Sequence, residues 1–303
     1  MRRSFFTLVI GALIAACGSE RWPGPPVVEQ TKYQEDYRTW REAQQALVSD
    51  VLSIVGVWPL DQGETAFGSD AALPIVLPLS GQPNRAGVFR RDGAMISVVP
   101  SPDSALRLAN GRPIREAMTL EQDVWIGSLL LYVADAGDDR RWLTARDMKH
   151  PAITNPPAIE MYPLDAKWRV AARFDALQSP KPVQVSDVRG GAMNFLALGQ
   201  LVFRLNEQEH RLTALGEPGG GEFFVMFKDP TNLDTTFGGY RILTPAVVNG
   251  GEWTVLDFNF TFNPPCAYSR YTLCPLPPAE NKLPVAIEAG LKRLPSVQGY
   301  SPS

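Results

Sequence analysis

The chain has few of the side chains that most often carry metal and acid-base chemistry. Its 303 residues include 2 histidines and 3 cysteines. So few imidazole and thiol groups leave little from which to build a structural zinc site, and a histidine-based catalytic centre has only His150 and His210 to draw on. The G-x-S-x-G elbow of serine hydrolases is absent as well. The sequence therefore predicts no metal and no cofactor.

A strong charge of either sign is also absent. The chain has 29 basic and 32 acidic residues, for a net charge of -3. Proteins that bind nucleic acid usually concentrate positive charge, so we expect no nucleic-acid partner. A hydrophobic content of 45% is ordinary and argues against both wholesale disorder and a polytopic membrane protein.

The first 17 residues have the pattern of a lipoprotein leader. Arg2 and Arg3 precede an uncharged run, 4–16, that is too short for the about 20 residues of a spanning helix but fits a signal peptide. The run ends in Ile14-Ala15-Ala16-Cys17, which resembles a bacterial lipobox, in which the cysteine is acylated. We predict that residues 1–17 are signal peptide and lipobox and that Cys17 is the lipidation site. The alternative is an ordinary secretory signal cleaved elsewhere.

This interpretation predicts a protein whose N-terminal lipid holds it in the membrane of a bacterial cell envelope. It would face the periplasm, or lie in the outer membrane if the host is Gram-negative. Three acyl chains would anchor it firmly, because a single chain binds only marginally. Residues 18–30 are polar and rich in proline and glycine, so we expect a tether that holds the folded part off the membrane. The oligomeric state stays open.

An amphipathic helix is expected over residues 32–55. Apolar residues recur there at helical spacing, with Thr31 as a possible N-cap and Gly56 as a possible stop. They are Tyr33, Tyr37, Trp40, Leu47, Val51 and Ile54. This stripe packs on its own domain or, alternatively, forms a partner-binding face.

Short β-strands separated by turn residues dominate the rest of the chain. A first β module, together with the helix, is predicted to cover residues 31–150. Its strands are predicted at 74–79, 87–91, 94–99, 105–108, 128–134 and 142–145. A proline-rich linker, 151–163, precedes a second β module, 164–295, and a tail, 296–303. In the second module strands are predicted at 168–174, 201–205, 211–215, 223–227 and 256–263. The predicted fold class is mainly β, with an N-terminal amphipathic helix and two sandwich-like or barrel-like modules.

The most regular alternation is at residues 256–263. Leu256, Phe258, Phe260 and Phe262 alternate there with Asp257, Asn259, Thr261 and Asn263. A period of two predicts one strand with an apolar face and a polar face.

A specific motif then covers residues 255–287, which read VLDFNFTFNPPCAYSRYTLCPLPPAENKLPVAI. It closely resembles the C-terminal signature of a bacterial and archaeal family catalogued as a domain of unknown function, number 1684. That signature joins D-F-N, N-P-P-C-A-Y, Y-x-x-C-P-L-P-P and E-N-x-L. Looser matches extend upstream over the whole mature chain, weakest at residues 80–160. The resemblance implies a two-part β architecture and no known reaction, and many members of the family carry a lipoprotein-type leader.

The first β module has a weaker resemblance of its own. Gly63, residues 67–69 and 75–78, and Asn110-Gly111 are spaced somewhat like a forkhead-associated sandwich. Ser69 stands where that fold would have an arginine, so the resemblance implies an analogous fold and not phosphopeptide binding.

Polar residues in and near the signature are the candidate binding site. They are Tyr240, Arg241, Asp257, Asn259, Asn263, Tyr271, Glu280 and Asn281. Converging, they could hold a small polar ligand, and Asp257 with Glu280 could serve as acid and base. Alternatively, they satisfy the backbone of residues 263–284, where six prolines lack an N–H group.

Cys266 and Cys274 remain after Cys17 is acylated. In an exported protein a pair this close predicts a disulfide, with a reactive thiol or half of a metal site as the alternatives. The predicted function is a non-catalytic envelope lipoprotein that binds a small polar ligand or an envelope protein, or is structural. The alternative is an envelope enzyme, such as a hydrolase, that uses Asp257 or Glu280.

Overall fold

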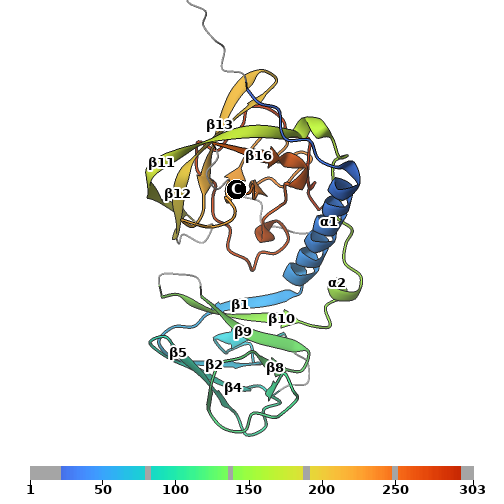
Figure 1. Cartoon of the computed structure of the whole chain (residues 1–303). Helices are drawn as coiled ribbons and strands as arrows, with labels where there is room; N and C mark the ends of the chain where they lie inside the picture. The colour runs from blue at the N-terminus through green and yellow to red at the C-terminus, as the bar shows by residue number, and fades with distance from the viewer. Residues whose placement is uncertain (1–21, 79–82, 136–138, 187–191, 248–251, 295–303) are drawn as a thin grey trace, which may run out of the picture.

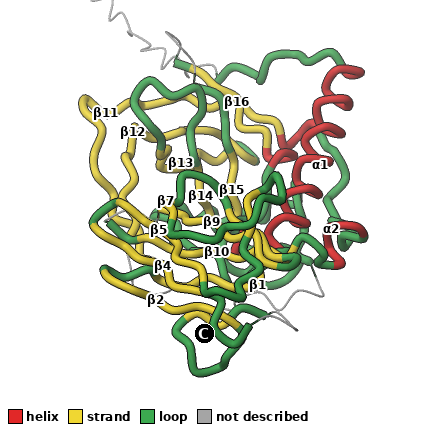
Figure 2. Tube along the Cα trace, turned by 90° about the horizontal axis from the view of Figure 1, so that it is seen from below, coloured by secondary structure: helices red, strands yellow, loops and turns green. Residues whose placement is uncertain are grey.

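The computed structural model describes residues 22–78, 83–135, 139–186, 192–247 and 252–294. Over these residues the protein is mainly β, and the long helix α1 runs beside two groups of sheets (Figure 1). Viewed from the end of the first group, α1 and the short helix α2 (Pro151–Thr154) lie together along one flank (Figure 2). Neither of these helices has the length and apolar character needed to cross a bilayer.

Helix α1 spans Gln30–Leu52, so it begins and ends a little earlier than residues 32–55. Its N-cap is Glu29, not Thr31, because the Glu29 carboxylate accepts hydrogen bonds from the backbone N–H groups of Thr31 and Lys32. Ser53 closes the helix, and Ile54 already belongs to strand β1.

The aromatic stripe of α1 packs on the C-terminal half of the chain, whereas the sequence grouped this helix with the first β module, 31–150. The rings of Tyr33, Tyr37 and Trp40 surround Phe260 at centroid distances of 5.8, 5.6 and 5.2 Å. Val48, further along α1, is fully buried. The helix is therefore fixed to the C-terminal half of the chain through contacts far apart in sequence.

The first β module is a sandwich of two five-stranded sheets. One sheet has the order β1 (Ile54–Pro59), β10 (Arg141–Asp147), β9 (Leu129–Asp135), β8 (Val124–Ile126) and β6 (Arg107–Leu108). The other has the order β3 (Ile75–Val76), β2 (Gly63–Gly68), β4 (Gly87–Asp92), β5 (Met95–Pro100) and β7 (Met118–Thr119). Phe67, Phe89 and Val98 from one sheet meet Leu131 and Leu143 from the other in a single apolar core.

The second group of sheets is built on a long hairpin. Its four-stranded sheet has the order β13 (Gln208–Leu215), β12 (Ala192–Leu205), β11 (Arg169–Ser186) and β16 (Trp253–Asp257). A separate pair joins β14 (Val225–Phe227) to β15 (Arg241–Leu243). Asn206 and Glu207, with φ values of 51° and 63°, form the turn between β12 and β13.

The prediction of a single long strand at 256–263 is wrong. Strand β16 ends at Asp257 and a 3₁₀ helix, η2 (Phe258–Phe260), follows. The Asp257 carboxylate accepts a hydrogen bond from the Asn259 backbone N–H, which favours a tight turn over a continued strand. Thr261 and Asn263 are both fully buried, so the expected polar face is not a solvent face.

The expected tether at 18–30 also differs from the structure in its described part. The Trp22 indole N–H donates to the carbonyl of Ala171 on β11 at 3.2 Å, and the Arg169 guanidinium donates to the carbonyl of Pro26. The segment that precedes α1 is therefore bound along the C-terminal sheet.

Candidate functional site

The candidate residues of the sequence do not converge on one site, and the first group of them lies where α1 meets β16. Tyr33 Oη donates to Asp257 Oδ2 at 2.8 Å, and Asn259 Nδ2 donates to Tyr33 Oη at 3.1 Å and to Asp257 Oδ1 at 3.0 Å. Arg169 Nε lies 3.5 Å from Asp257 Oδ2. Burial raises the pKa of the Asp257 carboxyl, against the opposing effect of these donors. This group joins the N-terminal helix to the sheet.

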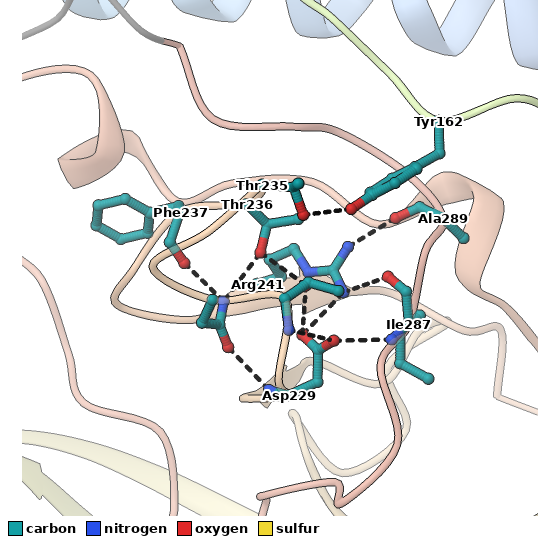
Figure 3. Close-up of polar contacts among 10 residues, drawn as sticks. Tyr162, Asp229, Thr235, Thr236, Phe237, Arg241, Ile287 and Ala289 are labelled. Carbon is teal, nitrogen blue, oxygen red and sulfur yellow. Dashed lines mark hydrogen bonds and ion pairs between the residues drawn. The ribbon is translucent and has the colours of Figure 1, made fainter.

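Arg241 belongs to a second, fully buried group, shown in Figure 3. Arg241 Nη2 donates to Asp229 Oδ1 at 2.9 Å, and neither side chain is exposed. The same guanidinium donates to the carbonyls of Ala289 at 2.6 Å and Ile287 at 2.8 Å, while the Ile287 backbone N–H donates to Asp229 Oδ2 at 2.8 Å. Burial lowers the pKa of Arg241, and Asp229 opposes that shift. The pair fastens the last described segment of the chain to β15.

Glu280 and Asn281 form a third group, around Thr213 on β13. Asn281 Oδ1 accepts from the Thr213 N–H at 2.7 Å, and its Nδ2 donates to the carbonyls of Thr213 and Met226 at 3.1 and 2.8 Å. Glu280 Oε1 accepts from Thr213 Oγ1 at 2.9 Å. These side chains complete backbone hydrogen bonding next to a proline-rich segment, as the scaffold interpretation expects.

Tyr240 and Asn263 are buried within the same half of the molecule. Asn263 Nδ2 donates to the carbonyl of Lys292 at 2.9 Å, and Tyr240 is packed in an apolar cluster with Cys266 and Cys274. The predicted disulfide is confirmed, with Cα atoms of these two cysteines 5.6 Å apart.

The structure does not bring Asp257 and Glu280 together as an acid-base pair. Asp257 pairs with Arg169 on β11. Thr213, which holds Glu280, pairs with Gln200 on β12, and Gln200 pairs with Asp175 on β11. Six positions along β11 separate Arg169 from Asp175, which is about 20 Å at 3.3 Å per residue. Two carboxyl groups on a shared substrate would need to be far closer.

Tyr271, the remaining candidate, lies in a cleft between the sandwich and the C-terminal half, which we call the junction cleft. Its volume is about 370 Å³. Its described lining has a first wall of Leu52, Ile54, Val55, Pro78 and His150, all earlier in the chain, and a second wall of Tyr268, Ser269, Arg270 and Tyr271. The disulfide brackets the second wall, since Cys266 and Cys274 flank residues 268–271.

The polar groups of the junction cleft are mainly hydrogen-bond donors. His150 Nδ1 accepts from the Ala152 N–H at 3.2 Å, which assigns the proton of the neutral imidazole to Nε2. The Arg270 guanidinium lies 5.2 Å from the centroid of the Tyr271 ring and donates to its hydroxyl at 3.2 Å. No acidic residue is among the described lining of the cleft. This combination of cation, donors and apolar wall suits a small anion.

Two other hollows lack this combination. One of about 410 Å³ follows residues 162–168 and is lined by Asp165 and Glu288 as well as Lys167. Another of about 290 Å³ lies between residues 183–186 and 276–280 and includes Glu280. Among the residues that the structure describes, no group of three His, Cys, Asp or Glu side chains is placed to hold a metal ion.

Comparison with known proteins places the second wall of the cleft in a family. Residues 157–292 match the family described as protein of unknown function (DUF1684). This part of the chain is a DUF1684 domain. An uncharacterized protein from Haloarcula marismortui, solved by solution NMR, is similar at 26% identity, covering 46% of this chain and 78% of its own, with a TM-score of 0.40. A search of curated proteins found no match.

The junction cleft lies across the boundary of the DUF1684 domain. Residues 268–271 belong to the domain, whereas Leu52, Pro78 and His150 lie before its first matched residue, 157. The looser resemblance expected upstream of that residue stays a prediction. Sequence reasoning missed His150, Ser269 and Arg270. The available signals were the scarcity of histidine and the S-R-Y of the signature, in which only Tyr271 was singled out.

Proposed function

We propose that this protein is a lipid-anchored protein of the bacterial cell envelope that binds a small anion, of the carboxylate or phosphate class, without catalysing a reaction. The observation that carries the binding role is the junction cleft, with Arg270, His150 and Tyr271 around a partly apolar hollow. Clefts between two structural units are common ligand sites. An arginine already held against a tyrosine ring loses less conformational freedom on binding an anion.

A non-catalytic role is supported by what the buried carboxylates contact. Asp257 is bound to Tyr33 and Asn259, and Asp229 is bound to Arg241 and to backbone. A general base needs a proton of the substrate within hydrogen-bond reach. Neither carboxylate lines the junction cleft.

The anion site is tested by calorimetric titration with inorganic phosphate and with acetate. We expect the Cys17→Ser protein to bind at least one of them, and Arg270→Gln to lower the affinity at least ten-fold. Arg112→Gln, an exposed arginine of the sandwich, is the matched control and should bind like the parent. Binding of both anions that is unchanged in Arg270→Gln would contradict the assignment.

The lipid anchor is tested separately in growing cells. The parent protein should incorporate labelled palmitate, and Cys17→Ser should not. Palmitate in Cys17→Ser would overturn the assignment of Cys17, whatever the outcome of the anion titration.

A further inference from the structure

Trp22 is held on the outer face of the C-terminal sheet by four contacts. Its indole N–H donates to the carbonyl of Ala171, and its ring meets Trp253 edge to face at a centroid distance of 4.8 Å. The guanidinium groups of Arg204 and Arg173 lie 4.9 and 5.7 Å from the centroid of the same ring. Trp22 is only partly buried by these contacts.

The strand register shows that these contacts belong to one face. Trp253 on β16 pairs with Arg173 on β11, which pairs with Val202 on β12, which pairs with Arg211 on β13. Arg204 lies two positions from Val202 and therefore on the same side of the sheet. The opposite side, with Ala172 and its neighbours, packs into the core. We call the outer side the Trp22 face. It carries Trp22, Trp253, Arg173, Arg204 and Arg211, together with Asp175, which pairs with Arg173 and Arg211, and Glu209, which pairs with Arg211.

The position of Cys17 limits how far this face lies from the lipid anchor. Cys17 precedes Trp22 by five residues, so even a fully extended chain separates them by at most about 18 Å. Figure 1 shows the first described residues, in dark blue, at the end of the molecule opposite the sandwich. Helix α1 then runs about 35 Å toward the sandwich.

We infer that the Trp22 face is the surface that contacts anionic phospholipid headgroups, so that the sandwich projects away from the membrane. This inference rests on the lipid-anchor part of the proposed function. Partly exposed tryptophan beside arginine is the chemistry of a membrane interface, because the indole is amphipathic and the guanidinium is attracted to lipid phosphate. The chain as a whole is negatively charged, so an affinity for anionic lipid would have to come from a local face.

The direct test couples the Cys17 thiol of residues 17–303 to a maleimide lipid in vesicles of equal parts phosphatidylcholine and phosphatidylglycerol. This chain keeps every described residue of the fold. Hydrogen exchange should slow in residues 22–29, 169–175 and 200–211 relative to the free protein, and stay unchanged in 54–135. Protection confined to the sandwich, or none on the Trp22 face, would overturn the inference. Because the coupling is chemical, this result does not depend on whether cells acylate Cys17.

A second measurement uses the uncoupled Cys17→Ser protein with the same vesicles. Arg204→Gln should weaken partitioning about five-fold, the value for one basic residue near an anionic surface. Arg90→Gln, an exposed arginine of the sandwich, should partition like the parent. Equal partitioning of Arg204→Gln and the parent would contradict the inference.

Discussion

The sandwich and the DUF1684 domain are both β structures, but they are held together differently. The sandwich core is a continuous apolar cluster, and its buried Arg91 pairs with Asp139, whose side chain is 68% exposed. In the DUF1684 domain Arg241 and Asp229 are both fully buried, hydrogen-bond to each other and also bind backbone groups of the last described segment. Both regions use a buried arginine to satisfy backbone carbonyls, but only the proline-rich DUF1684 domain buries the carboxylate partner as well.

Breaking the buried pair should have the largest effect. Arg241→Met leaves the Asp229 carboxylate without its charged partner in the interior, so we expect unfolding free energy to fall by about 3–5 kcal/mol. Urea denaturation checks this. Arg91→Met is the matched change in the sandwich and should cost less, because water can solvate Asp139. Equal losses in the two variants would contradict the comparison.

Removing the disulfide should have the next largest effect. Replacing Cys266 and Cys274 by serine frees a short loop in the unfolded chain, which costs about 2–3 kcal/mol on the chain-entropy model. The loss should appear in denaturation of the double variant and should match that of the reduced parent protein. An unfolding free energy of the parent protein that is the same with and without a reducing agent would argue against this contribution.

The contact between α1 and the sheet should contribute less. Tyr33→Phe keeps the ring against Phe260 but removes the hydrogen bond to Asp257, so we expect a loss of about 1.5 kcal/mol. Tyr132→Phe in the sandwich, also a half-buried tyrosine, is the control and should cost less. A larger loss in the control would show that the hydrogen bond between Tyr33 and Asp257 stabilises the contact of α1 with the sheet less than the geometry indicates.

The smallest expected effect is a pH dependence from Asp257. Burial raises its pKa in the folded protein above the unfolded value of about 3.9. A raised folded pKa contributes stability that is complete below the unfolded pKa and is lost as pH rises through the folded one. The stability difference between the parent and Asp257→Asn should therefore fall as pH increases from about 3.5 to 7. A difference that grows over this range would mean that the carboxylate is the favoured form.

Sequence patterns predict the regular parts of this fold well and the irregular parts poorly. The strands at 87–91 and 94–99 are found nearly as expected because apolar alternation and the turn at Asp92-Gly93 agree, with Gly93 at a φ of 60°. Strand β2 lacks such alternation and was missed. At 257–263 local hydrogen bonding by Asp257 outweighs a strand-like pattern, which no period count detects.

The candidate site shows the same division. Proximity in sequence predicted that Arg241, Asp257 and Glu280 share a site. The sheet register separates Asp257 from the Thr213 that holds Glu280, and Arg241 lies in the separate strand pair β14–β15. His150 and Arg270 both line the junction cleft although they lie 120 positions apart in the sequence. Only the packing of the sandwich on residues 268–271 brings them to one hollow. For these two residues the side-chain type indicated a possible binding role, whereas their spacing along the chain gave no sign that they lie together.

Binding of an anion between the sandwich and the DUF1684 domain is tested most directly by NMR titration of the Cys17→Ser protein with inorganic phosphate and with acetate. We predict saturable shifts of the backbone signals of residues 268–271 and of His150 with at least one anion, and their absence in Arg270→Gln. Shifts that neither saturate nor depend on Arg270, or that appear only away from these residues, would contradict the account.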